Sequence, residues 1–177
     1  GCGDRQCYSD VFLLKVQNGS VEIDKNWPSL PVPLANMTSS LLDNKIFVAG
    51  GQESVDAPIA SKHFFMLDLS DVKAGWKCLP AWPGAPRGYA VSAVQNDGFD
   101  KCFYLFSGRN YQNENIDVLT DGYAYNPRLS TWKKLEGRFP VMAGAAVASG
   151  ANHIIFLGSV QKMIDGSDTH PGFDNKL

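Results

Sequence analysis

Two arginines of the sequence stand where apolar strands are expected to begin or end. Arg109 directly follows an apolar run at residues 102–108, and Arg87 closely precedes a run of small residues at 89–94. A guanidinium group presents paired N–H donors that match the two oxygens of a carboxylate. If neighbouring inner strands bring these two positions together, the arginines predict a site that grips a carboxylate.

Each arginine also has a structural interpretation that the sequence leaves open. Arg87 could bond the carbonyl groups at the ends of strands, and Arg109 could pair with Glu114 or Asp117 across its own loop. Charged side chains in loops are most often solvated or paired locally. The same holds for Glu53, for which a solvated surface position is the simpler interpretation.

The composition excludes several classes of function. The chain has 177 residues, a formal net charge of -2 and a pI near 5.9. Its longest run of basic residues is a single Lys-Lys pair, so we expect no nucleic-acid partner. No apolar stretch approaches the length of a membrane span, so we expect none.

Four cysteines, Cys2, Cys7, Cys78 and Cys102, do not have the spacing of a zinc site. We therefore expect no metal, and we expect no cofactor. Cys2 and Cys7 are close enough to form a disulfide in an oxidising compartment, but two free thiols are an equal alternative.

An internal repeat of about fifty residues predicts the fold. Each unit contains a small-residue run, an apolar run that ends in glycine, an alternating aromatic run, and a short run opened by tryptophan. The glycine-ended runs lie at residues 45–51, 102–108 and 153–158, and the tryptophans are Trp27, Trp76 and Trp132. Four short strands in this order are typical of one blade of an all-β propeller.

The repeat divides the chain into two complete blades, at residues 34–84 and 85–139, and two half blades. Residues 1–33 correspond to the outer half of a blade, and residues 140–177 to the first half of another. An open arc of blades would expose strand edges. We therefore expect residues 1–177 to be a partial propeller of about three blades from a six-bladed ring, with the remaining blades supplied by a longer polypeptide or by another chain.

The repeat resembles the Kelch family. Gly50-Gly51 corresponds to the family's diglycine, and Tyr125-Asn-Pro-Arg-Leu-Ser-Thr-Trp132 is similar to its tyrosine-to-tryptophan segment. Two further segments, Trp82-Pro-Gly-Ala-Pro-Arg-Gly88 and His170-Pro-Gly-Phe-Asp-Asn-Lys-Leu177, resemble the bacterial sialic acid mutarotases, or N-acetylneuraminate epimerases, and in particular their cyclically permuted branch.

This resemblance implies an isomerase that interconverts the α and β anomers of free N-acetylneuraminate. It implies a periplasmic or other extracytoplasmic location and a sugar acid as the small-molecule partner. The catalytic residues that it suggests are Glu53, as a general base, and Arg87, which would hold the carboxylate together with Arg109. Hydrogen bonds to the sugar would come from Gln52, Asn110 and His170.

The sequence also leaves two other functions open. The same loop surface could bind a protein partner, or it could bind a carbohydrate without catalysis, because propellers support all three functions. His170 before a proline could simply fix a turn. His63 and His153 fall within expected strands, which favours a structural role for both.

Overall fold

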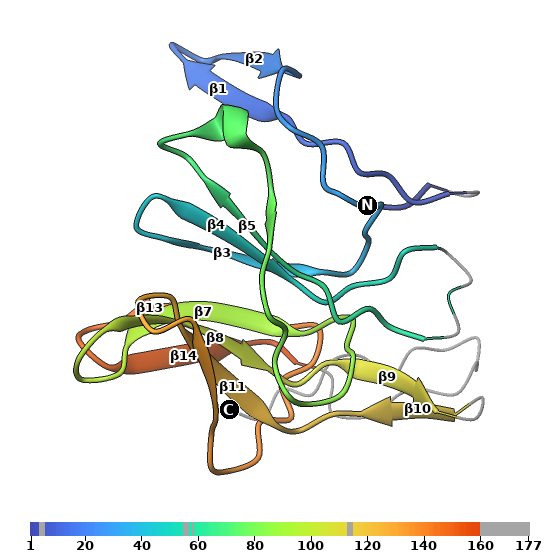
Figure 1. Cartoon of the computed structure of the whole chain (residues 1–177), viewed down its shortest axis with the longest axis vertical. Coiled ribbons are helices and arrows are strands. Elements are labelled where there is room, and N and C mark those ends of the chain that lie inside the picture. Colours follow the sequence, from blue (N-terminus) through green and yellow to red (C-terminus); the bar gives the residue numbers. More distant parts are fainter. Residues whose placement is uncertain (4–5, 55–56, 58, 113–114, 160–177) are drawn as a thin grey trace.

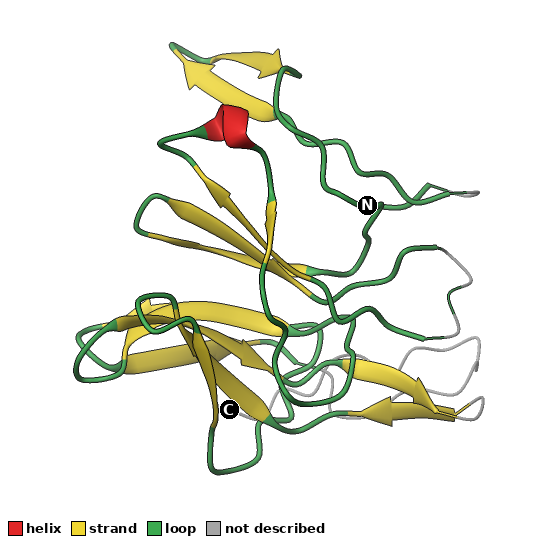
Figure 2. Ribbon diagram, in the orientation of Figure 1, coloured by secondary structure: helices red, strands yellow, loops and turns green. Residues whose placement is uncertain are grey.

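The computed structural model describes every residue except 4–5, 55–56, 58, 113–114 and 160–177. Within this described part, the only helical segment is the short 3-10 turn η1 (Val72–Ala74). All other elements are strands in antiparallel sheets, as Figure 2 shows. The all-β class predicted from the repeat is therefore confirmed.

Two four-stranded sheets form the centre of the molecule (Figure 1). The first has the order β3 (Thr38–Leu42), β4 (Lys45–Ala49), β5 (Phe64–Asp68) and β6 (Lys77–Cys78). The second has the order β7 (Val91–Asn96), β8 (Lys101–Phe106), β11 (Gly122–Asn126) and β12 (Thr131–Lys134). Each sheet places its strands side by side in chain order, which is the arrangement of a Kelch-type propeller blade.

Three hairpins accompany these sheets. They are β1 (Leu13–Gln17) with β2 (Ser20–Asp24), β9 (Arg109–Gln112) with β10 (Asn115–Val118), and β13 (Ala145–Ser149) with β14 (His153–Leu157). Strand β7 contacts both β3 and β13, so the first strands of three successive units lie next to one another. The hairpin β9–β10 extends from the end of the sheets opposite to the β3–β4 turn (Figure 1).

The first hairpin differs from the strand pattern that the repeat predicts. The repeat predicts the outer half of a blade over residues 1–33, with a strand opened by Trp27, but β1 begins at Leu13 and β2 ends at Asp24. Asn18 and Gly19, both with positive φ, form the two-residue turn between the strands. Such a turn fixes the register of a hairpin, and this local signal prevailed over the repeat.

Aromatic rings pack between the two four-stranded sheets. Phe47 and Phe64 of the first sheet meet Phe103, Tyr125 and Trp132 of the second, with ring centroids 4.9 Å apart for Phe64–Tyr125 and 5.8 Å apart for Phe47–Phe103. All but Trp132 are almost fully buried. Burial of one such ring contributes about 1.5–3 kcal/mol, so the aromatic layer fixes the two blades relative to each other.

Glycines allow the second strand of each blade to end close to the start of the first. Gly51 and Gly108 have φ values of 103° and 105°. A Cβ atom at these positions would lie 2.7 Å from the carbonyl oxygens of Ala35 and Gly88, respectively. The glycines therefore permit a backbone approach that any side chain would prevent.

The amino-terminal segment is fastened to the first blade. A disulfide joins Cys2 to Cys7, and the backbone nitrogen of Gly1 donates a hydrogen bond of 2.8 Å to the carbonyl of Leu34. Of the two alternatives that the sequence left for this cysteine pair, the structure has the disulfide.

Candidate functional site

Three residues in left-handed backbone conformation mark the point where the first strands of successive units come together. They are Asn36, Tyr89 and Ala143, with φ values of 54°, 56° and 56°. The N–H of Tyr89 donates to the carbonyl of Asn36 (2.8 Å), and the N–H of Ala143 donates to the carbonyl of Tyr89 (2.9 Å). We call these three residues the inner rim.

Two predicted site residues, Gln52 and Arg109, occupy equivalent positions beside the inner rim. Each follows the glycine that ends a second strand, and each exchanges two backbone hydrogen bonds with the residue before the rim. Gln52 bonds to Ala35, at 2.8 and 2.9 Å, and Arg109 bonds to Gly88, at 2.8 and 3.0 Å. The repeat thus sets the backbone of both residues.

Each of these side chains meets the rim residue of its own blade. The side-chain amide of Asn36 donates from Nδ2 to Oε1 of the buried Gln52 at 2.9 Å. The guanidinium carbon of the half-buried Arg109 lies 4.1 Å from the centre of the Tyr89 ring. An amide pair in one blade therefore corresponds to a cation–π pair in the next.

Gly88 brings the two pairs together. Its backbone is bonded to Arg109, and a Cβ atom on it would lie 3.7 Å from Cγ of Gln52. Gln52 and Arg109 thus lie on two sides of the same glycine. Both predicted residues therefore contact Gly88, and their roles in ligand binding stay predictions.

Glu53 lies beside Gln52 and pairs with His63. Glu53 Oε1 is 2.8 Å from His63 Nε2, and the side chain of Glu53 is 53% exposed. The His63 ring stacks on Phe65, with 5.1 Å between the ring centroids. The predicted general base is thus open to solvent and is held by a histidine, a residue for which the sequence favoured a purely structural role.

Asn110 follows Arg109 at the start of β9, and its side chain is almost fully buried. Its Oδ1 accepts a hydrogen bond of 3.4 Å from the backbone N–H of Ala60, in the loop of the preceding blade. This contact links the long loops of two blades. His170, the other residue predicted to bind the sugar, lies outside the described residues.

Arg87 is fully buried beneath this surface. Its guanidinium pairs with Asp121 at 2.9 and 3.2 Å and donates to the carbonyls of Ser107 (2.9 Å) and Ala85 (3.3 Å). It also lies 5.5 Å from the ring centre of Trp82. A ligand could reach this guanidinium only if the ion pair opened, so the geometry favours the structural interpretation of Arg87, in which it bonds strand-end carbonyls.

The partner of Arg87 has a perturbed carboxyl group. Burial alone would raise the pKa of Asp121, but hydrogen bonds from Arg87 and Tyr123 and the charge of Arg87 hold this pKa below its ordinary value. Burial, together with the hydrogen bond of 2.6 Å to Asp121, raises the pKa of Tyr123 to about 12. The cluster is therefore an anion, a cation and a neutral phenol at ordinary pH.

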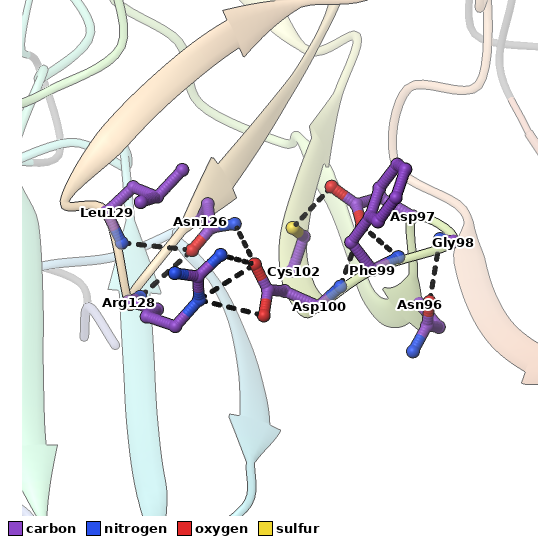
Figure 3. A network of polar contacts seen from close by, with 9 residues as sticks. All are labelled: Asn96, Asp97, Gly98, Phe99, Asp100, Cys102, Asn126, Arg128 and Leu129. Carbon is purple, nitrogen blue, oxygen red and sulfur yellow. Dashed lines mark hydrogen bonds and ion pairs between the residues drawn. The ribbon is translucent and has the colours of Figure 1, made fainter.

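The opposite end of the second sheet carries a different polar network (Figure 3). Arg128 forms three hydrogen bonds of 2.7 to 3.1 Å with Asp100, and its side chain is 65% exposed. Asp97 accepts bonds from the backbone N–H groups of Phe99 and Asp100, each at 2.9 Å. The Arg128–Asp100 bonds join the turns β7–β8 and β11–β12 to each other, and Asp97 closes the β7–β8 turn.

Neither metal binding nor a membrane-spanning helix is indicated by the described residues. Among them, no three His, Cys, Asp or Glu side chains are grouped so that they could hold a metal ion. None of the described segments forms a helix long and apolar enough to cross a membrane.

Comparison with known proteins gives consistent matches. The sequence profile of a protein family described as N-acetylneuraminate epimerase matches residues 27–167. An N-acetylneuraminate epimerase of Yersinia pestis (strain Pestoides F) is 29% identical over 162 residues, which cover 89% of the chain and 38% of that protein. One of Haemophilus influenzae (strain PittEE) is 33% identical over 131 residues, or 73% of the chain and 31% of that protein.

Two further similarities concern the repeat and the fold. A Kelch domain-containing protein of Vibrio cholerae is 31% identical over 139 residues, which cover 76% of the chain and 36% of that protein. The solved structure of YjhT superimposes with a TM-score of 0.58 at 23% identity, covering 75% of the chain and 36% of that structure. The chain spans less than two fifths of the length of each of these proteins.

Proposed function

Because the chain belongs to the N-acetylneuraminate epimerase family, we propose that its protein interconverts the α and β anomers of free N-acetylneuraminate. The observation that carries this proposal is the position of Arg109. Its guanidinium packs on the ring of the rim residue Tyr89, its backbone is hydrogen-bonded to Gly88, which Gln52 also contacts, and the exposed carboxylate of Glu53 follows Gln52 in the chain. These residues would offer one cation, one amide and one base to a sugar acid.

The carboxylate of the sugar is the group that Arg109 would bind. A half-buried guanidinium attracts an anion more strongly than an exposed one, because less water screens the charge. Gln52 would donate or accept a hydrogen bond at a sugar hydroxyl. Asn110 would act indirectly by joining the loop of Ala60 to β9, and a direct contact from His170 remains a prediction.

The reaction requires two proton transfers and no cofactor chemistry. A base takes the proton of the anomeric hydroxyl, the bond between the anomeric carbon and the ring oxygen breaks, and an acid protonates that oxygen to give the open-chain ketone. Reclosure on the other face of the carbonyl returns both protons and gives the other anomer. We propose Glu53 as the base, with His63 as the group that orients it.

Arg87 has a different role in this proposal from the catalytic one that the resemblance suggested. Its buried ion pair with Asp121 and its bonds to the carbonyls of Ser107 and Ala85 stabilise the strand ends on which Arg109 is placed. We therefore assign Arg87 to the support of the site and assign the contact with the carboxylate to Arg109.

Proton NMR of freshly dissolved N-acetylneuraminate tests the function. The full-length protein is expected to accelerate the equilibration of the two anomers, and Glu53→Gln is expected to slow the catalysed rate by about 100-fold, as is typical for loss of a general base. Glu22→Gln, on the exposed hairpin β1–β2, is the matched control and retains the rate. Equilibration no faster than in buffer would refute the mutarotase assignment.

We further propose that other propeller blades pack on the two outer hairpins. Val16 and Val21 of β1–β2 are 71% and 61% exposed, and Val147 and Ile155 of β13–β14 are 50% and 47% exposed. Exposed apolar side chains in such rows are typical of surfaces that pack against another element. Val147→Asp should destabilise the full-length protein, whereas unchanged stability would refute the packing.

The disulfide supports an extracytoplasmic location. Disulfides persist in oxidising compartments such as the periplasm and are rare in the bacterial cytosol, and Cys2 is bonded to Cys7 here. Mass spectrometry of the protein isolated from cell fractions tests this location. The oxidised form in the periplasmic fraction is expected, and a reduced form confined to the cytosol would contradict it.

A further inference from the structure

The two complete blades repeat one side-chain pairing with different chemistry. In both, the residue after the glycine of the second strand meets the left-handed residue at the start of the first strand. The pair is Gln52 with Asn36 in one blade and Arg109 with Tyr89 in the next. The backbone bonds of Gln52 and Arg109 are the same, whereas the rim residues that their side chains meet are different.

Tyr89 is an unusual residue for its backbone conformation. Left-handed backbone is tolerated by glycine and asparagine, whereas a bulky aromatic residue is strained there. Tyr89 has a φ of 56° and is held by hydrogen bonds to Asn36 on one side and to Ala143 on the other. A strained residue that its surroundings maintain is often part of a functional site.

The ring of Tyr89 is suited to hold a cation that must also bind an anion. The distance of 4.1 Å between the guanidinium carbon of Arg109 and the ring centre lies within the range of cation–π attraction. A neutral ring attracts the guanidinium without adding a negative charge. A carboxylate in the same place would instead compete with the carboxylate of the ligand.

We propose that Tyr89 is a positioning residue that holds the guanidinium of Arg109 in the orientation that binds the carboxylate of the sugar acid. This inference rests on the proposed function, because it concerns how the same site selects an acidic sugar. Tyr89 acts through Arg109 and takes no part in the proton transfers. Its loss should therefore weaken binding of the charged sugar and leave binding of an uncharged analogue unchanged.

The test compares N-acetylneuraminate with its methyl ester, which lacks the negative charge. Dissociation constants are measured by NMR titration of the full-length protein and its variants. In Tyr89→Gly the ring is absent, but the left-handed backbone is retained because glycine adopts it without strain. Binding of the acid is expected to weaken by about three- to tenfold, the range for loss of one cation–π contact, while binding of the ester stays the same.

Three further variants make the result specific. Tyr89→Phe keeps the ring and should retain wild-type discrimination between acid and ester. Tyr89→Asn introduces the residue found at the equivalent rim position, Asn36, and asparagine tolerates the left-handed backbone. This variant should lose the discrimination between acid and ester, as Tyr89→Gly does. Ala143→Gly makes the same backbone change at the third rim position, where no ring is lost, and should retain discrimination.

The kinetic constants separate positioning from a general structural defect. Tyr89→Gly should raise KM for anomer exchange by the same factor as the dissociation constant and leave kcat unchanged. In Arg109→Met, a second change to Tyr89→Gly should have no further effect on acid binding, because the two residues act through one contact.

The outcomes distinguish this inference from the proposed function. Absence of anomer exchange by the wild-type protein would overturn the function. Equal affinity of the wild-type protein for acid and ester would overturn the carboxylate contact of Arg109. Discrimination by the wild-type protein that persists in Tyr89→Gly and Tyr89→Asn, or that is lost equally in Tyr89→Phe, would overturn the positioning role of the Tyr89 ring.

Discussion

Arg87 and Arg128 belong to the same blade and each pairs with an aspartate, but they lie at opposite ends of the sheet. Arg87 is fully buried, and its guanidinium bonds Asp121 and two carbonyls below the inner rim. Arg128 bonds Asp100 across neighbouring turns with 65% of its side chain exposed (Figure 3). Burial thus distinguishes a pair that supports the site from a pair that joins two exposed turns.

At the inner rim, backbone hydrogen bonds join neighbouring blades, whereas at the opposite end neighbouring blades are joined through side chains such as Lys101 with Asp43. The backbone of Tyr89 bonds Asn36 and Ala143, while Asp97 accepts its two backbone bonds from Phe99 and Asp100 in its own turn. The geometry of the inner rim therefore depends on how the backbones of neighbouring blades pack. Matched changes at the two ends should differ in their effects for this reason.

The largest difference is expected for removal of the two arginines. Arg87→Met leaves the carboxylate of Asp121 without its partner in a partly buried position and should lower the free energy of unfolding by about 3 kcal/mol. Arg128→Met removes a solvent-screened pair and should leave the midpoint of denaturation almost unchanged. Equal effects in urea denaturation would contradict the distinction between the two ends.

A smaller difference is expected for two glycines with the same backbone. Gly108 and Gly98 both have a φ of 105°, but a Cβ at Gly108 would lie 2.7 Å from the carbonyl of Gly88, whereas none of the described atoms comes within 4 Å of one at Gly98. Gly98→Ala should cost about 1–2 kcal/mol from backbone strain alone. Gly108→Ala should cost about 1–3 kcal/mol more because of the clash, as measured by thermal or urea denaturation.

The smallest effect concerns the pH dependence of stability. The pKa of Asp121 is lower in the folded protein than its unfolded value of about 3.9. The unfolded state therefore binds the proton first, so the stabilisation is complete above pH ~4 and is lost as the pH falls through the folded pKa.

The measurement for this effect is the free energy of unfolding between pH 7 and pH 3. The loss of stability on acidification should be smaller in Asp121→Asn than in the wild-type protein. Asp43→Asn, which removes an exposed partner of Lys101, is the control. A wild-type slope retained in Asp121→Asn would show that the Arg87–Asp121 pair does not produce the acid dependence.

The fold was predictable because the same strand pattern recurs in successive repeats of the sequence. Small-residue runs recur at the same place in each unit and form β3, β7 and β13. The apolar runs that end in glycine follow them and form β4, β8 and β14. The equivalent backbone positions of Gln52 and Arg109 follow from the same repeat. The register of β1–β2 does not follow from the repeat, because the Asn18-Gly19 turn determines it locally.

The partners of the site residues could not be predicted in the same way. Asp121 lies 34 residues from Arg87 in the chain, so the sequence does not reveal their ion pair. Arg87 is buried only because the strands pack around it, and this burial is what favours a structural role over ligand binding. Tyr89 stands at the start of a small-residue run, where the sequence shows nothing of its left-handed backbone. His63 was expected within a strand, and its contact with Glu53 depends on the path of the long loop between them.

The proposed position of the sugar carboxylate at the inner rim is tested by comparing Arg109→Met with Arg128→Met in the NMR assay of anomer equilibration. If Arg109 binds the carboxylate, Arg109→Met should raise KM for N-acetylneuraminate by at least about tenfold, the loss of one charge-assisted contact. Arg128→Met should retain the wild-type KM and rate. Wild-type kinetics in Arg109→Met, or equal losses in both variants, would contradict the central claim that the sugar acid binds at the inner rim.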